Sequence, residues 1–252
     1  MCLPFVVAVL LTTALWVYYG RKWSFTIIAT AMYFPAVYAF LFVDGVWYFT
    51  LQVIGYDKIK EAVFYSAIAV IIVYVVVYGC VALDLSLGWA EAIPDSEVPN
   101  HPHKDITGYL RATGEEIGWR CYLLPCLLWH FSPPVALLIS GVAWGLFHVP
   151  VMILLTSLLK PQRPITTIVV QSLSCIEAAF PFGWLAIKCG FSAWPCAVMH
   201  ALWNRLNPDV LGSIYMQTPG KYKGEQWKIN GEGLAGCLVY LPVCALVIYD
   251  LS

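Results

Sequence analysis

The sequence predicts an all-α membrane protein: a polytopic bundle of about eight transmembrane helices that forms a single domain over residues 1–252. Hydrophobic residues make up 60% of the 252 residues and charged residues only 12%, whereas a soluble domain carries about 25% charged residues. Apolar runs of membrane-spanning length recur along the chain, and no internal repeat is evident. The net charge of −1 gives no reason to expect nucleic acid as a partner.

An α-helix needs about 20 apolar residues to cross a bilayer. The first apolar run has neither the basic n-region nor the A-x-A cleavage site of a signal peptide, so we count it within the fold, with an uncleaved signal anchor as the alternative. Residues 45–54 are aromatic but short, which indicates an interfacial or re-entrant piece, and residues 84–105 are too polar to cross. The expected spans are residues 3–19, 25–43, 62–83, a span that begins near residue 107, and residues 134–159, 165–187, 191–206 and 234–251.

Most of the nine cysteines lie within the apolar runs, and the sequence contains no CxxC pair. Cysteines in such runs behave as small buried apolar residues. We therefore expect no disulfide framework.

Basic residues are distributed unevenly between the two sides of the predicted bundle. Loops on the cytosolic side of membrane proteins carry an excess of lysine and arginine. The richer side is formed by the loops that follow the first, third, fifth and seventh spans, so we expect those loops to face the cytosol and both termini to face away from it. The richer side holds Arg21, Lys22, Lys104, Arg111, Lys160, Arg163, Arg205, Lys221, Lys223 and Lys228, and the poorer side holds Lys58, Lys60 and Lys188.

Glu115, Glu116 and Arg120 place three ionisable groups in an otherwise apolar run. A charge at bilayer depth costs about 2.5–3.5 kcal/mol on insertion scales, so such groups indicate a functional site by default. Glu116 and Arg120 are four residues apart with the acid first, the favourable order for an ion pair on a helix. Glu115 lies about 100° around the helix from Glu116 and has no basic residue three or four positions on. We therefore expect Glu116 and Arg120 to form a structural ion pair and Glu115 to be the chemical group; a packing role for all three is the alternative.

Further polar groups lie inside the other expected spans. His148 is in the fifth span, where the alternative to a site role is a core histidine bonded to a backbone carbonyl, such as the one that Pro150 leaves without a donor. His200 and Asn204 are one turn apart on one face of the seventh span, and their alternative role is hydrogen bonding between helices. Glu177 is a lone acid in the sixth span.

The depths of these groups agree. At a rise of 1.5 Å per residue, Glu115, His148 and His200 lie roughly 12, 16 and 9 Å from the cytosolic ends of their helices. One shared cavity in the cytosolic half explains this agreement. In such a cavity a carboxylate and an imidazole can deprotonate water, and a second histidine with the Asn204 amide can donate to the oxyanion of a tetrahedral intermediate.

Three motifs in order resemble the CAAX prenyl protease and bacteriocin-processing family of intramembrane proteases. The family pattern is EExxxR, FxxxH and HxxxN, and the resemblance covers residues 109–204 (core motif region 107–206) with a weaker echo at residues 230–233. One departure is Trp144, where the family usually has Phe, and we interpret it as a change in pocket shape. The matching stretches are GEEIGWR at 114–120 with YLLP at 122–125, FHVP at 147–150 and HALWN at 200–204.

The resemblance implies an intramembrane endopeptidase whose site residues match these motifs. Glu115 and His148 would hold the attacking water, and His200 and Asn204 would line the oxyanion hole. The remaining motif residues, Glu116 and Arg120, would be structural.

Zinc is a possible cofactor, because two histidines and a carboxylate with an open position form the ligand set of hydrolytic zinc sites. The ligands would be Glu115, His148 and His200. We favour metal-independent chemistry, because Asn204 suits an oxyanion hole better than a ligand sphere. His101 and His103 in the polar connector are expected to be solvated.

Two non-enzymatic readings are open. A membrane scaffold or immunity-type protein of the same fold would keep the ion pair but would not need Glu115, His148, His200 and Asn204 together. A proton-coupled transporter also buries Glu and His, but such carriers often show repeats. The combination of all four residues favours the enzyme.

The expected partners are the lipid bilayer and a membrane-associated or prenylated peptide or protein. A prenylated CAAX tail suits a cavity that opens towards the cytosol, where lipidated C-termini lie; another membrane peptide is equally compatible. The protein would reside in the endoplasmic reticulum of a eukaryote or the plasma membrane of a bacterium.

Overall fold

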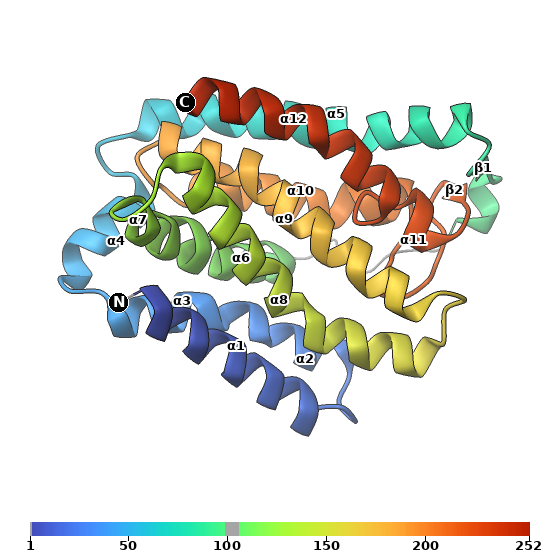
Figure 1. The fold of residues 1–252 in the computed structure, drawn as a ribbon, viewed down its shortest axis with the longest axis horizontal. Helices are drawn as coiled ribbons and strands as arrows, with labels where there is room; N and C mark the ends of the chain where they lie inside the picture. Colours follow the sequence, from blue (N-terminus) through green and yellow to red (C-terminus); the bar gives the residue numbers. More distant parts are fainter. Residues whose placement is uncertain (1, 99–105) are drawn as a thin grey trace.

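The computed structural model describes residues 2–98 and 106–252, which form a bundle of roughly parallel and antiparallel helices (Figure 1). The all-α, polytopic architecture expected from the sequence is confirmed. The only strands in this described part are two residues long and pair antiparallel, Glu91 with Lys223 and Ala92 with Tyr222. The elements are α1 (Cys2–Tyr19), α2 (Phe25–Ile28), η1 (Ala29–Tyr33), α3 (Phe34–Phe42), α4 (Val46–Ile54), α5 (Ile59–Ser86), β1 (Glu91–Ala92), η2 (Asp95–Glu97), α6 (Ile106–Glu116), η3 (Ile117–Leu123), α7 (Leu124–Leu128), α8 (Pro133–Leu159), α9 (Pro164–Lys188), α10 (Trp194–Val210), β2 (Tyr222–Lys223), α11 (Gln226–Ile229) and α12 (Leu234–Leu251).

Within the described residues, six helical segments are long and apolar enough to cross a membrane. The two other expected spans are also helical: α6 continues through η3 into α7, and α10 covers most of the seventh. These two segments carry the EExxxR and HxxxN motifs and are the more polar ones. They tolerate polar groups because α10 packs against α5, α6 and α9, and α6 packs against α3 and α10, so neighbouring helices surround them. The six apolar segments are Cys2–Tyr19, Phe25–Phe42, Ile59–Ser86, Pro133–Leu159, Pro164–Lys188 and Gln226–Leu251.

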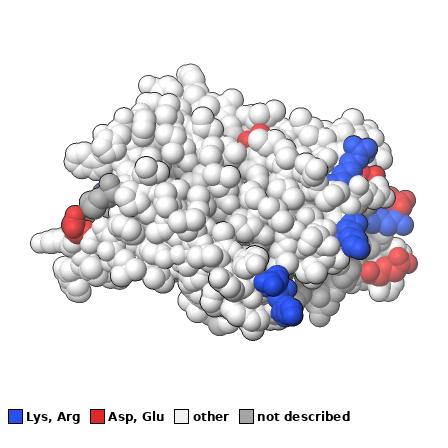
Figure 2. Space-filling model, turned by 60° about the horizontal axis from the view of Figure 1, so that its bottom comes forward, with Lys and Arg blue, Asp and Glu red and all other residues white. Residues whose placement is uncertain are grey.

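The outer surface of the bundle is apolar. Large side chains such as Leu3, Leu41 and Leu246 are about seven-tenths exposed, a pattern that suits a lipid environment, in which the backbone satisfies its hydrogen bonds within helices. Figure 2 shows a broad uncharged face, with the visible lysines and arginines gathered towards one end. The protein is therefore an integral, multi-pass membrane protein.

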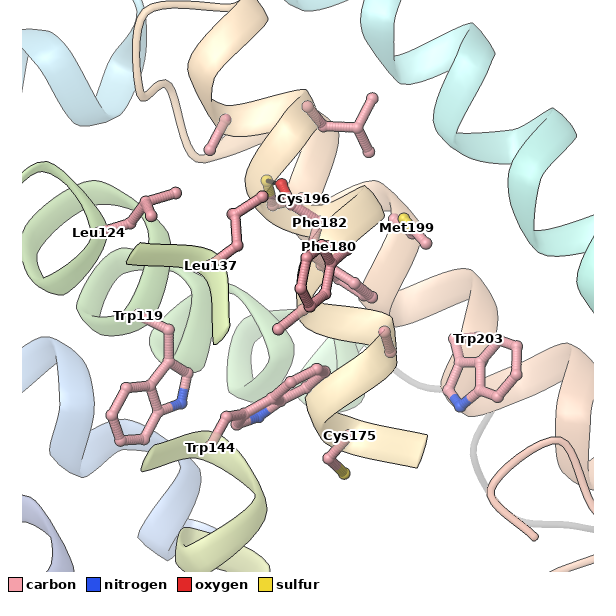
Figure 3. Close-up of a cluster of buried hydrophobic side chains, with 14 of the residues drawn as sticks. Trp119, Leu124, Leu137, Trp144, Cys175, Phe180, Phe182, Cys196, Met199 and Trp203 are labelled. Carbon is pink, nitrogen blue, oxygen red and sulfur yellow. Dashed lines mark hydrogen bonds between the residues drawn. The ribbon is translucent and has the colours of Figure 1, made fainter. Parts of the chain in front are cut away.

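The interior is closed by an apolar cluster that joins four helices. Leu124 of α7, Leu137 of α8, Phe182 of α9 and Met199 of α10 belong to one buried core (Figure 3). Such close packing fixes the relative positions of the helices that carry the motifs.

The segment that follows the two glutamates is a π-helix, a form that often occurs at functional sites. Pro125 lacks an N–H, so it leaves the carbonyl of Cys121 without its usual helical donor. The side chain of Gln52 in α4 donates to this carbonyl at 3.0 Å. Gly118 lets the segment approach α3, because a Cβ at this position would collide with Pro35. The short aromatic helix α4 thus supports the motif helix from outside.

The cysteine prediction is wrong in one respect, because Cys2 and Cys126 form a disulfide. The two residues are 124 positions apart in the sequence, and their Cα atoms lie 5.8 Å apart where the start of α1 meets α7. Sequence spacing carries no information on such a contact between distant helices. The other cysteines are free and are buried or half-buried, as expected of small apolar residues.

Candidate functional site

A cavity of about 630 Å³ lies among α6, α8, α9 and α10 and brings the motif residues together. Glu115, His148, His200 and Asn204 all line it. Each comes from one of the three sequence motifs. The structure therefore places the four candidate catalytic residues on the wall of one space, large enough for part of a peptide substrate.

Glu115 is the acid that faces the cavity. Its side chain is 1% exposed, and the indole Nε1–H of Trp144 donates to its Oε2 at 2.7 Å. It forms no ion pair with another described residue. A carboxylate held on one oxygen by a neutral donor keeps the other oxygen available for a proton.

Glu116 is not among the residues that line the cavity and joins two other motif residues. Its Oε2 lies 3.2 Å from Nε of Arg120, so the expected ion pair is present. Its Oε1 lies 2.7 Å from Nδ1 of His200, a contact across two helices that the sequence did not suggest. Glu116 therefore holds Arg120 through an ion pair and also orients the imidazole of His200, which lines the cavity.

Arg120 is 1% exposed and lies between two aromatic faces. The centre of its guanidinium is 4.1 Å from the ring centre of Trp144 and 4.8 Å from that of Phe182. Its nitrogens have no partner in hydrogen-bond geometry within the described residues. The ion pair with Glu116 and these cation–π contacts stabilise the buried charge instead.

Trp144 connects the two sides of the site. Its indole holds Glu115, and its ring lies beside those of His148 and His200 with centroid distances of 5.7 and 5.8 Å. Figure 3 shows this tryptophan at the edge of the apolar core. The interpretation of Trp144 as a change in pocket shape missed its main contribution, because a Phe could not donate this hydrogen bond.

His148 contacts a backbone carbonyl through Nδ1, at 2.9 Å from the carbonyl oxygen of Trp144. A bond to a backbone carbonyl is also what the alternative role of a core histidine predicts, although the carbonyl is that of Trp144 and not that of Leu146, which Pro150 leaves without a donor. With Nδ1 occupied in this way, Nε2 is the nitrogen that remains for the cavity. His148 can therefore serve as a proton acceptor beside Glu115.

His200 and Asn204 lie one turn apart on α10, on the same cavity wall. An imidazole that donates from Nδ1 to Glu116 can also donate from Nε2 when it is protonated. The Asn204 side chain is half-buried and makes no hydrogen bond to another described residue. Both groups are thus placed to offer N–H donors to a substrate oxygen.

Comparison with protein families finds a match for the part of the chain that carries these residues. The family model of the type II CAAX prenyl endopeptidases, Rce1-like, matches residues 106–206. This part of the chain is therefore similar to that family. The matched segment runs from α6 to α10 and contains all three motifs. A search of curated proteins gives no match.

One acid of the cavity lies outside the segment that matches the Rce1-like family. Glu232 and Tyr215 also line the cavity, and Trp203 Nε1–H donates to Oε1 of Glu232 at 2.9 Å. The weak echo at residues 230–233 was the only sequence signal for this acid, and nothing in the sequence suggested Tyr215. Burial, with Glu232 nearby, raises the pKa of Tyr215 well above its usual value, so this phenol remains neutral at physiological pH.

The candidate zinc ligands Glu115, His148 and His200 do not gather into a metal site. In the described part of the chain, no group of three or more His, Cys, Asp and Glu side chains is arranged to hold a metal ion. As placed, the residues do not fit zinc, so no step below passes through a metal. His101 and His103 lie outside the described residues. Glu177 is in α9 and is not part of the cavity lining.

Proposed function

We propose that this protein is an intramembrane endopeptidase that cleaves a peptide bond near the C-terminus of a prenylated CAAX protein. The match of residues 106–206 to the Rce1-like family model supports protease chemistry. The observation that carries the proposal is the cavity wall itself, where Glu115, His148, His200 and Asn204 face one space while the adjacent Glu116 is turned away to Arg120 and His200. A non-catalytic scaffold would need only the latter contacts.

In the proposed reaction, Glu115 takes a proton from a water molecule that His148 helps to orient. The Trp144 indole fixes the direction of the acceptor carboxylate. The hydroxide attacks the carbonyl carbon of the scissile bond, and the negative charge on the carbonyl oxygen is met by N–H groups of His200 and Asn204. Each oxyanion donor is typically worth about 10²–10³ in rate.

Two arginines support a substrate with a free C-terminal carboxylate. Arg111 and Arg205 line the same cavity, and neither forms an ion pair with another described residue. Arg111 is one turn before Glu115 on α6, about 6 Å along the helix. A carboxylate a few residues beyond the scissile bond would therefore be within its reach, and a guanidinium suits a carboxylate well. Apolar side chains such as Val17, Ile28 and Val151 would contact the lipid group.

The orientation predicted from the charges gains support from the disulfide. The start of α1 and the end of α12 lie at the same end of the bundle (Figure 1). The Cys2–Cys126 disulfide lies at that end. Disulfides persist in oxidising compartments outside the cytosol. We therefore place this end in the lumen of the endoplasmic reticulum, if the organism is a eukaryote, or outside the plasma membrane of a bacterium.

The test of this function is peptide specificity in detergent solution. A farnesylated CAAX peptide should be cleaved, and the same peptide with a C-terminal amide should have a raised KM because it lacks the charge that the arginines bind. Arg111→Gln should narrow the difference between the two peptides. If the amidated peptide and a peptide that lacks the farnesyl group were both cleaved as fast as the farnesylated CAAX peptide, a CAAX substrate would be contradicted. Another membrane peptide would then be favoured as the substrate.

A further inference from the structure

The cavity contains a second carboxyl group, that of Glu232, to which the family motifs assign no role. It lies in the turn between α11 and α12, beyond the matched segment 106–206. It shares the cavity with Glu115, and His148 and His200 are the histidines with which it interacts electrostatically. A second acid beside the reacting groups requires an explanation.

The position of Glu232 is fixed by a buried network of side-chain amides. Asn230 Oδ1 accepts the backbone N–H of Glu232 at 2.9 Å and a bond from Asn207 Nδ2 at 3.0 Å. Asn207 Oδ1 accepts the backbone N–H of Gly231 at 3.1 Å, and Asn230 Nδ2 donates to Gln226 Oε1 at 2.9 Å. These three amide side chains are almost fully buried. Satisfied buried networks of this kind rigidify a structure, so the turn holds Glu232 in one place.

The carboxyl group itself is only half satisfied. Oε1 accepts the indole N–H of Trp203, but Oε2 is inaccessible to solvent and has no hydrogen-bond partner among the described residues. The phenol of Tyr215 is nearby, although not in hydrogen-bond geometry. Glu115 is held in the same way, by one indole N–H from Trp144. Two acids, each with one oxygen held by an indole N–H, therefore line the same cavity.

Peptide hydrolysis needs two proton transfers, and no group described so far is assigned to the second. Glu115 removes a proton from water, while His200 and Asn204 stabilise the oxyanion. The departing nitrogen must also gain a proton, because an amide anion is a very poor leaving group. Enzymes commonly assign the two transfers to two acids in different environments.

We propose that Glu232 is the general acid that protonates the departing amine, an inference that rests on the proposed peptidase function. When water attacks, the new C–O bond forms and one water proton moves to Glu115. When the tetrahedral intermediate collapses, the C–N bond breaks and its electron pair takes the proton from Glu232 Oε2. The products are a carboxylic acid and an amine, and transfer of the proton from Glu115 to Glu232 through cavity water restores the starting state.

The test compares leaving groups. An amide substrate needs the acid, whereas an aryl ester of the same acyl peptide releases a phenolate that needs no proton. Glu232→Gln, which can still accept the Trp203 bond, should lower kcat on the amide by about 10²–10⁴ and leave the ester rate within a few-fold of the wild type. Glu115→Gln should lose both activities. The matched control is Glu225→Gln, because Glu225 also accepts an indole N–H, from Trp227, but lies on the surface.

An equal loss on amide and ester in the Glu232→Gln variant would overturn the proposal, as would unchanged rates on both. Glu232→Asp, which keeps the acid but shortens it, provides the second measurement if Glu232→Gln does not fold. The ratio of its kcat on the amide to its kcat on the ester should fall below that of the wild type. An unchanged ratio would also overturn the proposal. If folded wild-type protein cleaved neither substrate, the proposed peptidase function would have failed instead.

Discussion

Glu116→Gln tests the separation of roles between the two adjacent glutamates. Glu116 is 0% exposed, and its two oxygens contact Arg120 at 3.2 Å and His200 at 2.7 Å. An amide has one acceptor oxygen, and its NH₂ group would face a donor on one of the two partners. The substitution therefore leaves either the buried guanidinium or the imidazole without its acceptor.

The expected loss of stability follows from the burial of this pair. Removing one partner of a buried ion pair costs about 3–5 kcal/mol. For a chain of this size, each kcal/mol lowers the Tm by about 2–4 °C, so Glu116→Gln should lower it by roughly 6–20 °C. Hydrolysis should also fall, because His200 loses the carboxylate that orients it.

The assay is thermal unfolding of purified protein in detergent, followed by tryptophan fluorescence, together with peptidase activity. Glu115→Gln is the control, because it makes the same chemical change one position away at a residue without an ion pair. It should abolish hydrolysis and keep a Tm close to that of the wild type. A fully stable Glu116→Gln protein together with an unfolded Glu115→Gln protein would mean that the two roles are assigned backwards.

Three further predictions follow from the site and the charge pattern. Asn204→Ala should lower kcat by about 10²–10³ with little change in KM. The fold-loss of kcat in the double variant with His200→Ala should be smaller than the product of the two single losses. A large rise in KM at constant kcat would mean that Asn204 only holds substrate. Trp144→Phe keeps the aromatic ring but removes a hydrogen bond to a charged group worth about 1.5–3 kcal/mol, so kcat should fall roughly tenfold to a hundredfold; an unchanged kcat would show that this indole does not position the base. Tags at the two chain ends should be inaccessible from the cytosol in sealed vesicles, and a cytosolic tag at either end would overturn the orientation.

The helices and the EExxxR pair were predictable because they depend on local patterns. Apolar runs predicted the helices, and the i,i+4 spacing predicted the contact between Glu116 and Arg120. Helical geometry also separated Glu115 from its neighbour. The apolar runs and the helical spacing are both properties of a single helix, so they can be recognised without knowing how the helices pack.

The contacts between elements could not be predicted in the same way. The bond from Trp144 to Glu115 joins α8 to α6, and the bond from Glu116 to His200 joins α6 to α10. No periodicity records which side chains meet across two helices. The Cys2–Cys126 disulfide was missed for this reason. Depth along the membrane did predict that Glu115, His148 and His200 share one cavity.

The measurement that tests the central claim most directly is cleavage of a farnesylated CAAX peptide by purified wild-type and Glu115→Gln proteins, each with and without a chelator. We expect mass spectrometry to show release of the residues after the prenylated cysteine by the wild type, at the same rate with chelator, and no release by the folded Glu115→Gln protein. Loss of activity with chelator and its return with zinc would instead support a metalloprotease. Cleavage that persists in Glu115→Gln, or no cleavage by the folded wild type, would contradict the claim that Glu115 activates the attacking water.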